Sequence, residues 1–462
     1  MPVSTFEYKT VVNADPRAAV MPFIYTPHPV IGLSPEALDK YIVGNDPETG
    51  KPIITEILDL LTKPLKEEAP AAPPLTGAPP PAPAAPAAPP PPQFLGPDTE
   101  ENLQRLFYEK GWTDGLPVIL PTEERVQAML KGTAAAPDEV VAESFQFDTH
   151  EMVQYNVTNI AIIAVMAGAR PEYFPVILAT AATRQSSLMP STTPFEAMLL
   201  VNGPIRKEIG LNCGIAAFSA VTMANSVIGR AWTLMSICHG FAKLRSTLWS
   251  TQGNNHTYNN MCAGENEERS VWEPFHVTRG FKAEESVVSV FRGWAMVNSY
   301  GAASKRTLLE ELCAQWAIMP PMNSSGTVIM DPLVARNLKE NEGFATKKDY
   351  ARHLSQNVKM TAGQYWKTDH IDMLMASEAY KGVEPYASWK KLPDDALIAP
   401  YFNPDNINII VVGGETSPLW KAADYGYSGS SSVDRWRALN TGDECADGSC
   451  GLPDEKTDAD YD

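Results

Sequence analysis

Apolar side chains recur at helical spacing most clearly between Thr222 and Arg245. Residues three and four positions apart lie on the same face of an α-helix. The residues that meet this spacing are Val227, Ile228, Ala231, Leu234, Met235, Cys238, Phe241 and Ala242. The pattern predicts a long helix with one buried face.

Shorter segments carry the signals of helix starts and ends. Ser, Thr or Asp at a helix start accepts hydrogen bonds from free backbone N–H groups, and glycine commonly follows a helix end. Together with apolar spacing, these signals predict helices after Ser34-Pro35, over Ile54–Leu61, from the cap Asp98 to Gly111, from the cap Thr122 over Glu123–Lys131, and over Asn159–Ala167 and Glu172–Thr183.

Short apolar runs bounded by turn residues indicate strands. They are Pro117–Leu120, Ala197–Val201, Ser286–Phe291, Thr327–Met330 and Ile407–Val412. One local signal opposes the second strand, because Thr193-Pro194-Phe195-Glu196 fits a helix capping box. No repeat of 20–50 residues is apparent. Strands that alternate with helices predict the α/β class, with a mixed or largely parallel sheet flanked by helices.

Proline divides the chain. In Ala69–Pro92 half of the residues are proline, which fixes φ and removes the amide donor. We therefore predict an extended spacer over residues 69–93. It separates an N-terminal helical segment, residues 1–68, from an α/β body, residues 94–437, and an acidic flexible tail follows over residues 438–462. Two short helices make a poor core, so we expect the N-terminal segment to dock on the body or on a neighbouring subunit.

Charge and cysteine content narrow the function. The chain has 37 Lys and Arg against 55 Asp and Glu, a formal net charge of -18. Nucleic acids and anionic membranes are bound by clustered basic residues, so we expect neither as a partner. Six cysteines in 462 residues do not make a disulfide framework. Met1–Val12 lacks the pattern of a secretory signal. These features predict a reduced, cytoplasmic protein.

The first candidate site is the loop after the best strand pattern. Ile407–Val412 runs directly into Gly413-Gly414. Ligands of open α/β sheets gather at the carboxyl ends of strands, and glycine lets the backbone approach a ligand closely. Gly413 and Gly414 are therefore candidate substrate-binding residues, with an ordinary strand-to-helix turn as the alternative. No phosphate-binding glycine motif occurs, so nucleotide binding is not indicated and no cofactor is assigned.

The second candidate site lies in Asn202–Arg230. Arg206 and Arg230 are candidates for a two-point clamp on a substrate carboxylate. Asn225 falls near the start of the long predicted helix, where free N–H groups favour an anionic or carbonyl group, and Asn212 joins this set. The alternative is that Asn225 caps the backbone locally and that the arginines form surface ion pairs.

The third candidate site is Gln252–His276, a polar stretch without hydrophobic period that predicts a loop. Cys262 with His256 suits a thiolate and its base. Glu265 suits a general acid or base if burial raises its pKa, and His276 is a further catalytic partner. A metal held by His256, Cys262 and Glu265 is a weaker alternative, because the spacing matches no closed zinc pattern.

Two cysteines, Cys445 and Cys450, lie close together in the acidic tail. Thiols at this spacing can form a strained, reducible disulfide or bind a soft metal. Acidic neighbours raise a thiol pKa and reduce its reactivity. Incidental cysteines in a solvated tail are therefore the alternative.

Five segments in sequence order resemble one bacterial family. They are Ala164–Val176, Val201–Glu208, Ala224–Ala231, Trp272–Val277 and Val411–Gly414. The family is found beside, or fused to, small proteins that carry the UGSC motif, some of which use selenocysteine. The resemblance spans roughly residues 111–433 and implies an enzyme-like body with thiol or selenol chemistry. Relatives carry cysteine where this chain has Ala169, so that thiol is not present here.

The sequence leaves three functional hypotheses open. The first is an enzyme acting on a small anionic or polar organic substrate, by thiol-assisted redox chemistry or carbon–heteroatom bond cleavage. The second is a non-catalytic subunit of a larger complex that docks through residues 1–68, and a homo-oligomer is expected. The third is a soft-metal carrier that uses Cys445 and Cys450. The first hypothesis requires the three candidate stretches to meet at one place in the fold.

Overall fold

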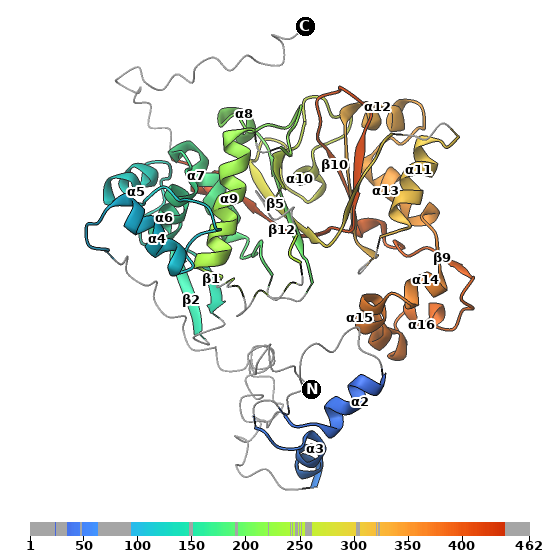
Figure 1. Ribbon diagram of the computed structural model, residues 1–462. Coiled ribbons are helices and arrows are strands. Elements are labelled where there is room, and N and C mark those ends of the chain that lie inside the picture. The colour runs from blue at the N-terminus through green and yellow to red at the C-terminus, as the bar shows by residue number, and fades with distance from the viewer. Residues whose placement is uncertain are drawn as a thin grey trace, which may run out of the picture.

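The structure is a computed structural model. It describes residues 35–46, 49–62, 94–146, 151–189, 193–219, 221–240, 261–301, 305–319 and 324–438, and the isolated positions 24, 242, 244, 248, 250, 252–254 and 321. Two mixed four-stranded sheets organise the body (Figure 1). The first sheet has the order β12-β5-β3-β4, from β3 (Glu196–Asn202), β4 (Cys262–Gly264), β5 (Val287–Gly293) and β12 (Gly426–Ser432). The second has the order β10-β7-β11-β6, from β6 (Met296–Asn298), β7 (Gly326–Met330), β10 (Ile407–Val411) and β11 (Trp420–Ala423).

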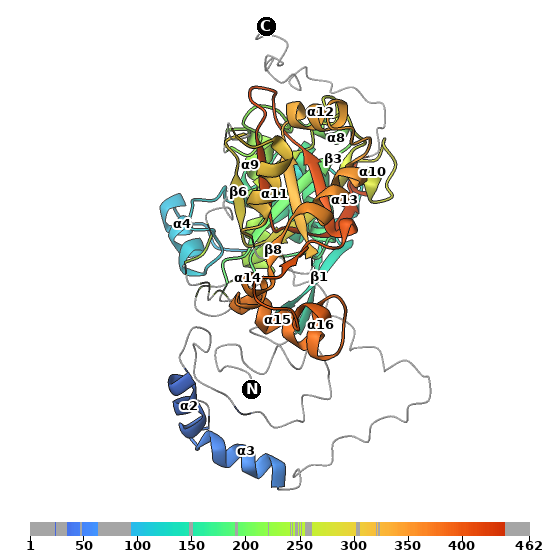
Figure 2. The ribbon, with the colours of Figure 1, turned by 90° about the vertical axis from the view of Figure 1, so that its right-hand side faces the viewer.

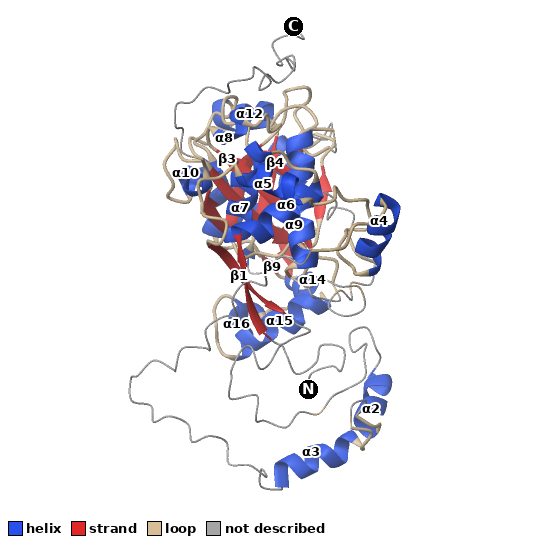
Figure 3. Ribbon diagram, turned by 90° about the vertical axis from the view of Figure 1, so that its left-hand side faces the viewer, coloured by secondary structure: helices blue, strands red, loops and turns tan. Residues whose placement is uncertain are grey.

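The two sheets pack face to face between two layers of helices. Successive side chains of a strand point to opposite faces, so Leu199 of β3 faces a helical core while Leu200 packs with Ile410 of the second sheet. The helices over the first sheet are α6 (Val157–Ala167), α7 (Phe174–Ala182) and α9 (Met223–Cys238). Those over the second are α11 (Leu308–Trp316), α12 (Pro332–Glu340) and α13 (Lys347–Asn357). Figures 2 and 3 show these outer layers in front of the strands from either side.

Both sheets have the same topology. In each, a first strand is followed by helices and then by a parallel neighbour, β3 by β4 and β7 by β10. A third strand, β5 or β11, then pairs antiparallel with the first. Each third strand continues into the other sheet, because β5 leads to β6, which pairs with β11, and β11 leads to β12, which pairs with β5. The body therefore consists of a first half (β3–β5) and a second half (β7–β11) that exchange their last strands.

Further elements surround these halves. On the first half's side are α4 (Glu100–Glu109), α5 (Glu123–Leu130), the hairpin of β1 (Val140–Gln146) and β2 (Glu151–Asn156), and the short helices α8 (Ile205–Glu208) and α10 (Phe275–Thr278). A small helical cluster follows α13, with β8 (Met360–Thr361), α14 (Ala362–Trp366), α15 (Asp369–Tyr380), α16 (Tyr386–Trp389) and β9 (Leu397–Ile398). The N-terminal helices α2 (Pro35–Val43) and α3 (Ile53–Thr62) lie apart from the body (Figure 1). No helix in the described ranges is long and apolar enough to cross a membrane.

The predicted α/β class with a mixed sheet and flanking helices is confirmed, although the strands form two sheets. Strands at 197–201, 286–291, 327–330 and 407–412 correspond to β3, β5, β7 and β10. The capping-box signal at Thr193–Glu196 does not produce a helix, because β3 pairs with neighbours on both sides and its seven residues are all buried. The predicted spacer, the tail beyond residue 438 and the cap Ser34 lie outside the described residues.

Several local predictions are wrong. Pro117–Leu120 forms no strand, because the side-chain amide of Gln104 occupies both backbone groups of Val118, at 2.7 and 3.2 Å. The cap of α4 is Thr99, one residue later than Asp98. The long helix ends at Cys238, where Gly240 N donates back to Met235 O.

The stretch Gln252–His276 is not a continuous loop. Its described part contains the strand β4 and the beginning of α10. β4 has only three residues, too few to show an alternating pattern, and it exists because it pairs parallel with β3. Its pairing places the residues that follow it at the carboxyl end of the first sheet.

Candidate functional site

The carboxyl ends of β4 and β10 meet at the junction of the two sheets. Asn266 N donates to Val411 O at 2.8 Å, and Asn266 Nδ2 donates to Gly413 O at 2.8 Å. In return, Val411 N donates to Glu265 Oε1 at 3.2 Å. We call this region the edge junction. It contains two of the three candidate stretches.

The third stretch joins the same junction through the loop between α8 and α9. Gly264 N donates to Asn212 O at 3.2 Å, and Gly413 N donates to Cys213 O at 3.0 Å. Asn225 is 2 % exposed, and its amide donates to the carbonyl oxygens of Asn212 and Cys262. Asn225 therefore holds the backbone of this loop. This local role was the alternative to binding a ligand.

Glu265 is the centre of the edge junction. It is completely buried, and Oε1 contacts Lys347 Nζ at 2.6 Å. Oε2 accepts from Asn202 Nδ2 at 2.7 Å and from Phe275 N at 2.6 Å. Burial alone raises the pKa of Glu265, but the Lys347 charge and these hydrogen bonds outweigh it, so the pKa lies below its usual value. The condition for general acid–base work, a raised pKa, is therefore not met.

Arg206 is also held by groups of the chain. It is 3 % exposed, and Nη1 donates to Glu265 O at 2.7 Å. Its Nη2 contacts Glu267 Oε2 at 2.9 Å and Glu268 Oε1 at 3.0 Å. Burial raises the pKa of Glu268, but the bonds from Arg206 and Lys207 lower it to about 2. Arg206 alone therefore holds the Glu268 carboxylate through two nitrogens, and the predicted clamp of Arg206 with Arg230 is not formed.

Arg230 does not reach the edge junction. It lies on α9 and forms a bidentate pair with Asp114, at 2.9 and 3.0 Å, and also donates to Pro117 O at 2.7 Å. The structure therefore separates Arg206 from Arg230, because each is bound to different segments. Arg230 fixes the segment before α5 to α9. It therefore forms an ion pair within the chain, which was the alternative to binding a substrate carboxylate.

The structure places two of the predicted catalytic partners, Cys262 and His276. Cys262 is 3 % exposed within the apolar core, and burial raises the pKa of its thiol far above the usual value. His276 is fully buried, and its Nε2 lies 3.0 Å from Lys282 O. His256 lies outside the described residues, as do Cys445 and Cys450. A thiolate at Cys262 is disfavoured because no charge among the residues that the structure describes compensates its burial.

Gly413 and Gly414 approach protein atoms rather than an open space. A Cβ on Gly413 would lie 2.3 Å from Asp331 Oδ2, and its φ is +148°. A Cβ on Gly414 would lie 2.2 Å from Ile215 Cγ1. Gly413 therefore allows the loop after β10 to pack against Asp331, and Gly414 allows it to pack against the loop between α8 and α9.

The sequence reasoning gave no role to Cys213 or Lys347. Cys213 is half-buried, and its Sγ lies 3.9 Å from Arg206 Nη1. Burial raises the pKa of this thiol, while the Arg206 guanidinium opposes the rise. Lys347 is the first residue of α13 and is 4 % exposed. A cation at a helix N-terminus is disfavoured by the helix dipole, and this was a signal available from the sequence.

Comparison with known proteins assigns the chain to no family. No family model, no curated protein and no solved structure matches the chain. The resemblance to the UGSC-associated family therefore stays a prediction. Within the described ranges, no group of three or more His, Cys, Asp or Glu side chains is placed to hold a metal ion.

Proposed function

We propose that the chain is an enzyme that acts on a small anionic or polar organic substrate by thiol-assisted chemistry at the edge junction. The observation that carries this proposal is the contact between the half-buried Cys213 thiol and the buried Arg206 guanidinium, at the carboxyl ends of parallel strands. Open α/β sheets bind ligands at this position. The resemblance to the UGSC-associated family implies the same kind of chemistry.

The charges suggest how a substrate is bound. The Arg206 side chain is 3 % exposed and stays in place, whereas the Glu268 side chain is 41 % exposed. An anionic substrate that replaces Glu268 on Arg206 lies next to Cys213. Glu268 raises the pKa of Cys213 and Arg206 lowers it, so Arg206 is the group that stabilises a thiolate beside the bound substrate. The proposed reaction is redox chemistry or cleavage of a carbon–heteroatom bond.

Site-resolved alkylation tests the proposal. Iodoacetamide reacts with the thiolate, so its rate at each cysteine reports the thiolate fraction. We expect Cys213 to react faster than Cys313, a half-buried cysteine whose pKa is raised by burial to about 11. Glu268→Gln should accelerate alkylation of Cys213 by roughly two- to tenfold at pH 8. A tenfold increase corresponds to lowering the pKa of the Cys213 thiol by about one unit. Glu172→Gln, which removes a carboxylate of similar exposure (47 %) elsewhere, is the control.

Timed labelling of the full chain, followed by digestion and mass spectrometry of the peptides, gives the rate at each of the two cysteines. A panel of small carboxylates should then contain compounds that slow labelling of Cys213 and leave Cys313 unchanged. Equal rates at the two cysteines, together with no response to Glu268→Gln, would contradict the role of Arg206 and Cys213.

A second function is favoured by the N-terminal helices. Leu58 of α3 is 54 % exposed, and Val43 and Leu61 are 72 % and 78 % exposed. Exposed apolar residues of this size mark interaction surfaces, which suits a subunit that docks through residues 1–68. Deleting residues 1–92 should reduce the number of chains per particle, measured by light scattering, if the segment assembles the protein, and leave that number unchanged otherwise.

A further inference from the structure

Exposed apolar side chains lie in the loop between α8 and α9 and at the start of α9, next to the proposed thiol site. Ile215 is 53 % exposed, Val221 is 77 % exposed, and Met223, the first residue of α9, is 44 % exposed. The same loop also sends a side chain inward, because Ala217 packs in the core between the two sheets. The three outer side chains are therefore apolar surface that the folded chain leaves uncovered. We call them the apolar rim.

Hydrogen bonds of Asn212 place the apolar rim around the thiol. Asn212 Nδ2 donates to the carbonyl oxygen of Ile215 at 2.8 Å and to Thr222 Oγ1 at 3.3 Å. In the chain, Thr222 lies between the other two residues of the rim, and Asn212 directly precedes Cys213. The loop therefore closes around the residue next to the thiol and carries its exposed apolar side chains there.

The rim also adjoins the arginine of the site. Gly413 N donates to Cys213 O at 3.0 Å, and the next residue, Gly414, lies directly against Ile215. Two consecutive glycines thus hold Cys213 and Ile215 close to each other. Cys213 Sγ in turn lies 3.9 Å from Arg206 Nη1. A guanidinium, a thiol and an apolar surface therefore follow one another at the edge junction.

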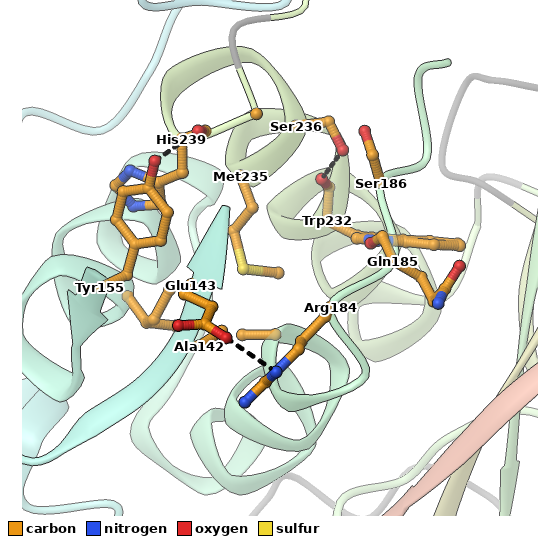
Figure 4. Close-up of a pocket in the computed structure, with 13 residues that line it drawn as sticks. Ala142, Glu143, Tyr155, Arg184, Gln185, Ser186, Trp232, Met235, Ser236 and His239 are labelled. Carbon is orange, nitrogen blue, oxygen red and sulfur yellow. Dashed lines mark hydrogen bonds and ion pairs between the residues drawn. The ribbon is translucent and has the colours of Figure 1, made fainter. Parts of the chain in front are cut away.

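A second apolar hollow lies at the other end of α9, and Figure 4 shows Trp232 and Met235 in its wall. His239, also in its lining, is roughly 21 Å along the helix from Asn225, at 1.5 Å per residue. None of the residues that the structure places in this lining is a cysteine. A ligand bound there leaves the labelling of Cys213 unchanged. The labelling rate of Cys213 therefore reports on the edge junction and not on this hollow.

We propose that the substrate of the edge junction is a carboxylate that carries an apolar chain. This inference rests on the proposed function and adds the part of the substrate that the charges leave open. The carboxylate lies on Arg206 in the place of Glu268, and the chain lies on the apolar rim. Each methylene group buried in this way tightens binding by up to about fourfold. A small polar anion gains nothing from the rim.

The experiment measures how well acetate, butyrate, hexanoate and octanoate protect Cys213 of the full chain from iodoacetamide at pH 8. The concentration that halves the labelling rate gives the affinity of each carboxylate. We expect octanoate to bind at least tenfold more tightly than acetate and to leave the labelling of Cys313 unchanged. Hexan-1-ol has the chain without the charge, and it should protect Cys213 at least tenfold less than hexanoate.

The outcomes separate this inference from the proposed function. Equal protection by acetate and octanoate overturns the apolar substrate and leaves the proposed anion site intact. Protection by hexan-1-ol equal to that by hexanoate also overturns the inference, because the carboxylate then has no role. Protection by none of the four carboxylates contradicts the proposed function, and the inference falls with it.

Variants locate the chain on the rim. Ile215→Ser should weaken the binding of octanoate at least threefold and that of acetate by less than twofold. Ile318→Ser, at an isoleucine that is 73 % exposed after α11, is the matched control and should change neither affinity. Met223→Ser repeats the test in case Ile215→Ser disturbs the contact with Gly414. Unchanged octanoate binding in both rim variants would overturn the proposal.

A second copy of the chain is the other possible occupant of the rim, and light scattering distinguishes it. We expect Ile215→Ser to leave the number of chains per particle unchanged, because the rim binds substrate. A lower number of chains per particle in Ile215→Ser, together with equal protection by all four carboxylates, would make the rim a contact between chains and overturn the proposal.

Discussion

The two halves of the body share a topology, and each has a glutamate beyond its edge strand in a different environment. In the first half Glu265 directly follows β4, and in the second half Glu415 lies four residues beyond β10. Glu265 is completely buried and bound to Lys347 of the other half. The Glu415 side chain is 16 % exposed and pairs with Arg269 and Arg336. Equal strand order therefore does not give equal chemistry, because burial decides what a carboxylate does.

The difference has an energetic meaning. A buried pair keeps its partners in place because a single charge left behind in the interior is costly. An exposed pair gains little, since water screens the charges. Two ion pairs connect the halves, Glu265 with Lys347 and Glu415 with Arg269. We infer that the buried pair contributes more to holding the halves together than the partly exposed one.

The largest effect is expected from breaking the buried pair. Lys347→Met leaves the Glu265 charge buried without its cation, and should lower the free energy of unfolding by about 3–5 kcal/mol. Urea denaturation measures this loss. Met retains most of the aliphatic volume, so a loss below about 1 kcal/mol would mean that the pair does not hold the halves together.

Asp424 lies between β11 and β12. We expect its carboxyl group to make the folded protein less stable as pH rises. Asp424 Oδ1 accepts from Trp294 N and Ala295 N at 2.9 and 3.0 Å, and burial raises its pKa from 3.8 to about 6. Because the folded-state pKa lies above the unfolded value, stability falls as pH rises through this window, by about 3 kcal/mol for two units. Asp424→Asn should remove this decline, measured as thermal unfolding from pH 4 to pH 7.

Glu265 responds to pH in the other direction. Its folded-state pKa lies below the usual value of 4.5, so its contribution to stability is present above that pH and is lost as pH falls. The wild-type minus Asp424→Asn difference isolates the Asp424 contribution from this one. A difference that stays constant, or that grows with rising pH between pH 4 and pH 6, would contradict the assignment.

An intermediate effect is expected from the glycine contacts. Gly414→Ala places a Cβ 2.2 Å from Ile215 Cγ1, and overpacking of this kind costs about 1–3 kcal/mol. Gly96→Ala, where nothing lies within 4 Å, is the control and should change stability by less than about 0.5 kcal/mol. Equal effects of the two substitutions would mean that the loop after β10 does not pack closely.

The smallest effect is expected from the exposed pair. Glu415→Gln should lower the free energy of unfolding by at most about 1 kcal/mol, because its partner Arg269 is 50 % exposed at the side chain and Arg336 is 40 % exposed. The same urea titration measures it. A loss of stability as large as that of Lys347→Met would contradict the claim that the buried pair contributes more than the exposed one.

Some of the fold follows from the sequence, for physical reasons. β3, β5, β7 and β10 are runs of five to seven residues with buried apolar side chains, so their pattern is visible in the chain. β4 and β6 have three residues each. They become strands only through their partners, as does β12, whose sequence is rich in glycine and serine. The exchange of strands between halves is likewise a tertiary property.

The candidate site shows the same division. Strand ends and polar residues led to Arg206, Asn212, Asn225, Glu265 and Gly413, and the structure brings these together. Their roles depend on partners that no local pattern reveals, such as Lys347, which lies 82 residues from Glu265. Arg230 and Cys262 were chosen by residue type, and their neighbours give them other roles. Residue chemistry predicts candidates, and burial selects among them.

The most direct test asks whether the two halves behave as one body. Thiol labelling during urea titration, read by mass spectrometry, follows Cys262 in β4 of the first half and Cys313 in α11 of the second. We expect both cysteines of the wild-type chain to become reactive at one urea midpoint, and the midpoints to separate in Lys347→Met. Two distinct midpoints in the wild-type chain would contradict the claim that the halves are joined at Glu265.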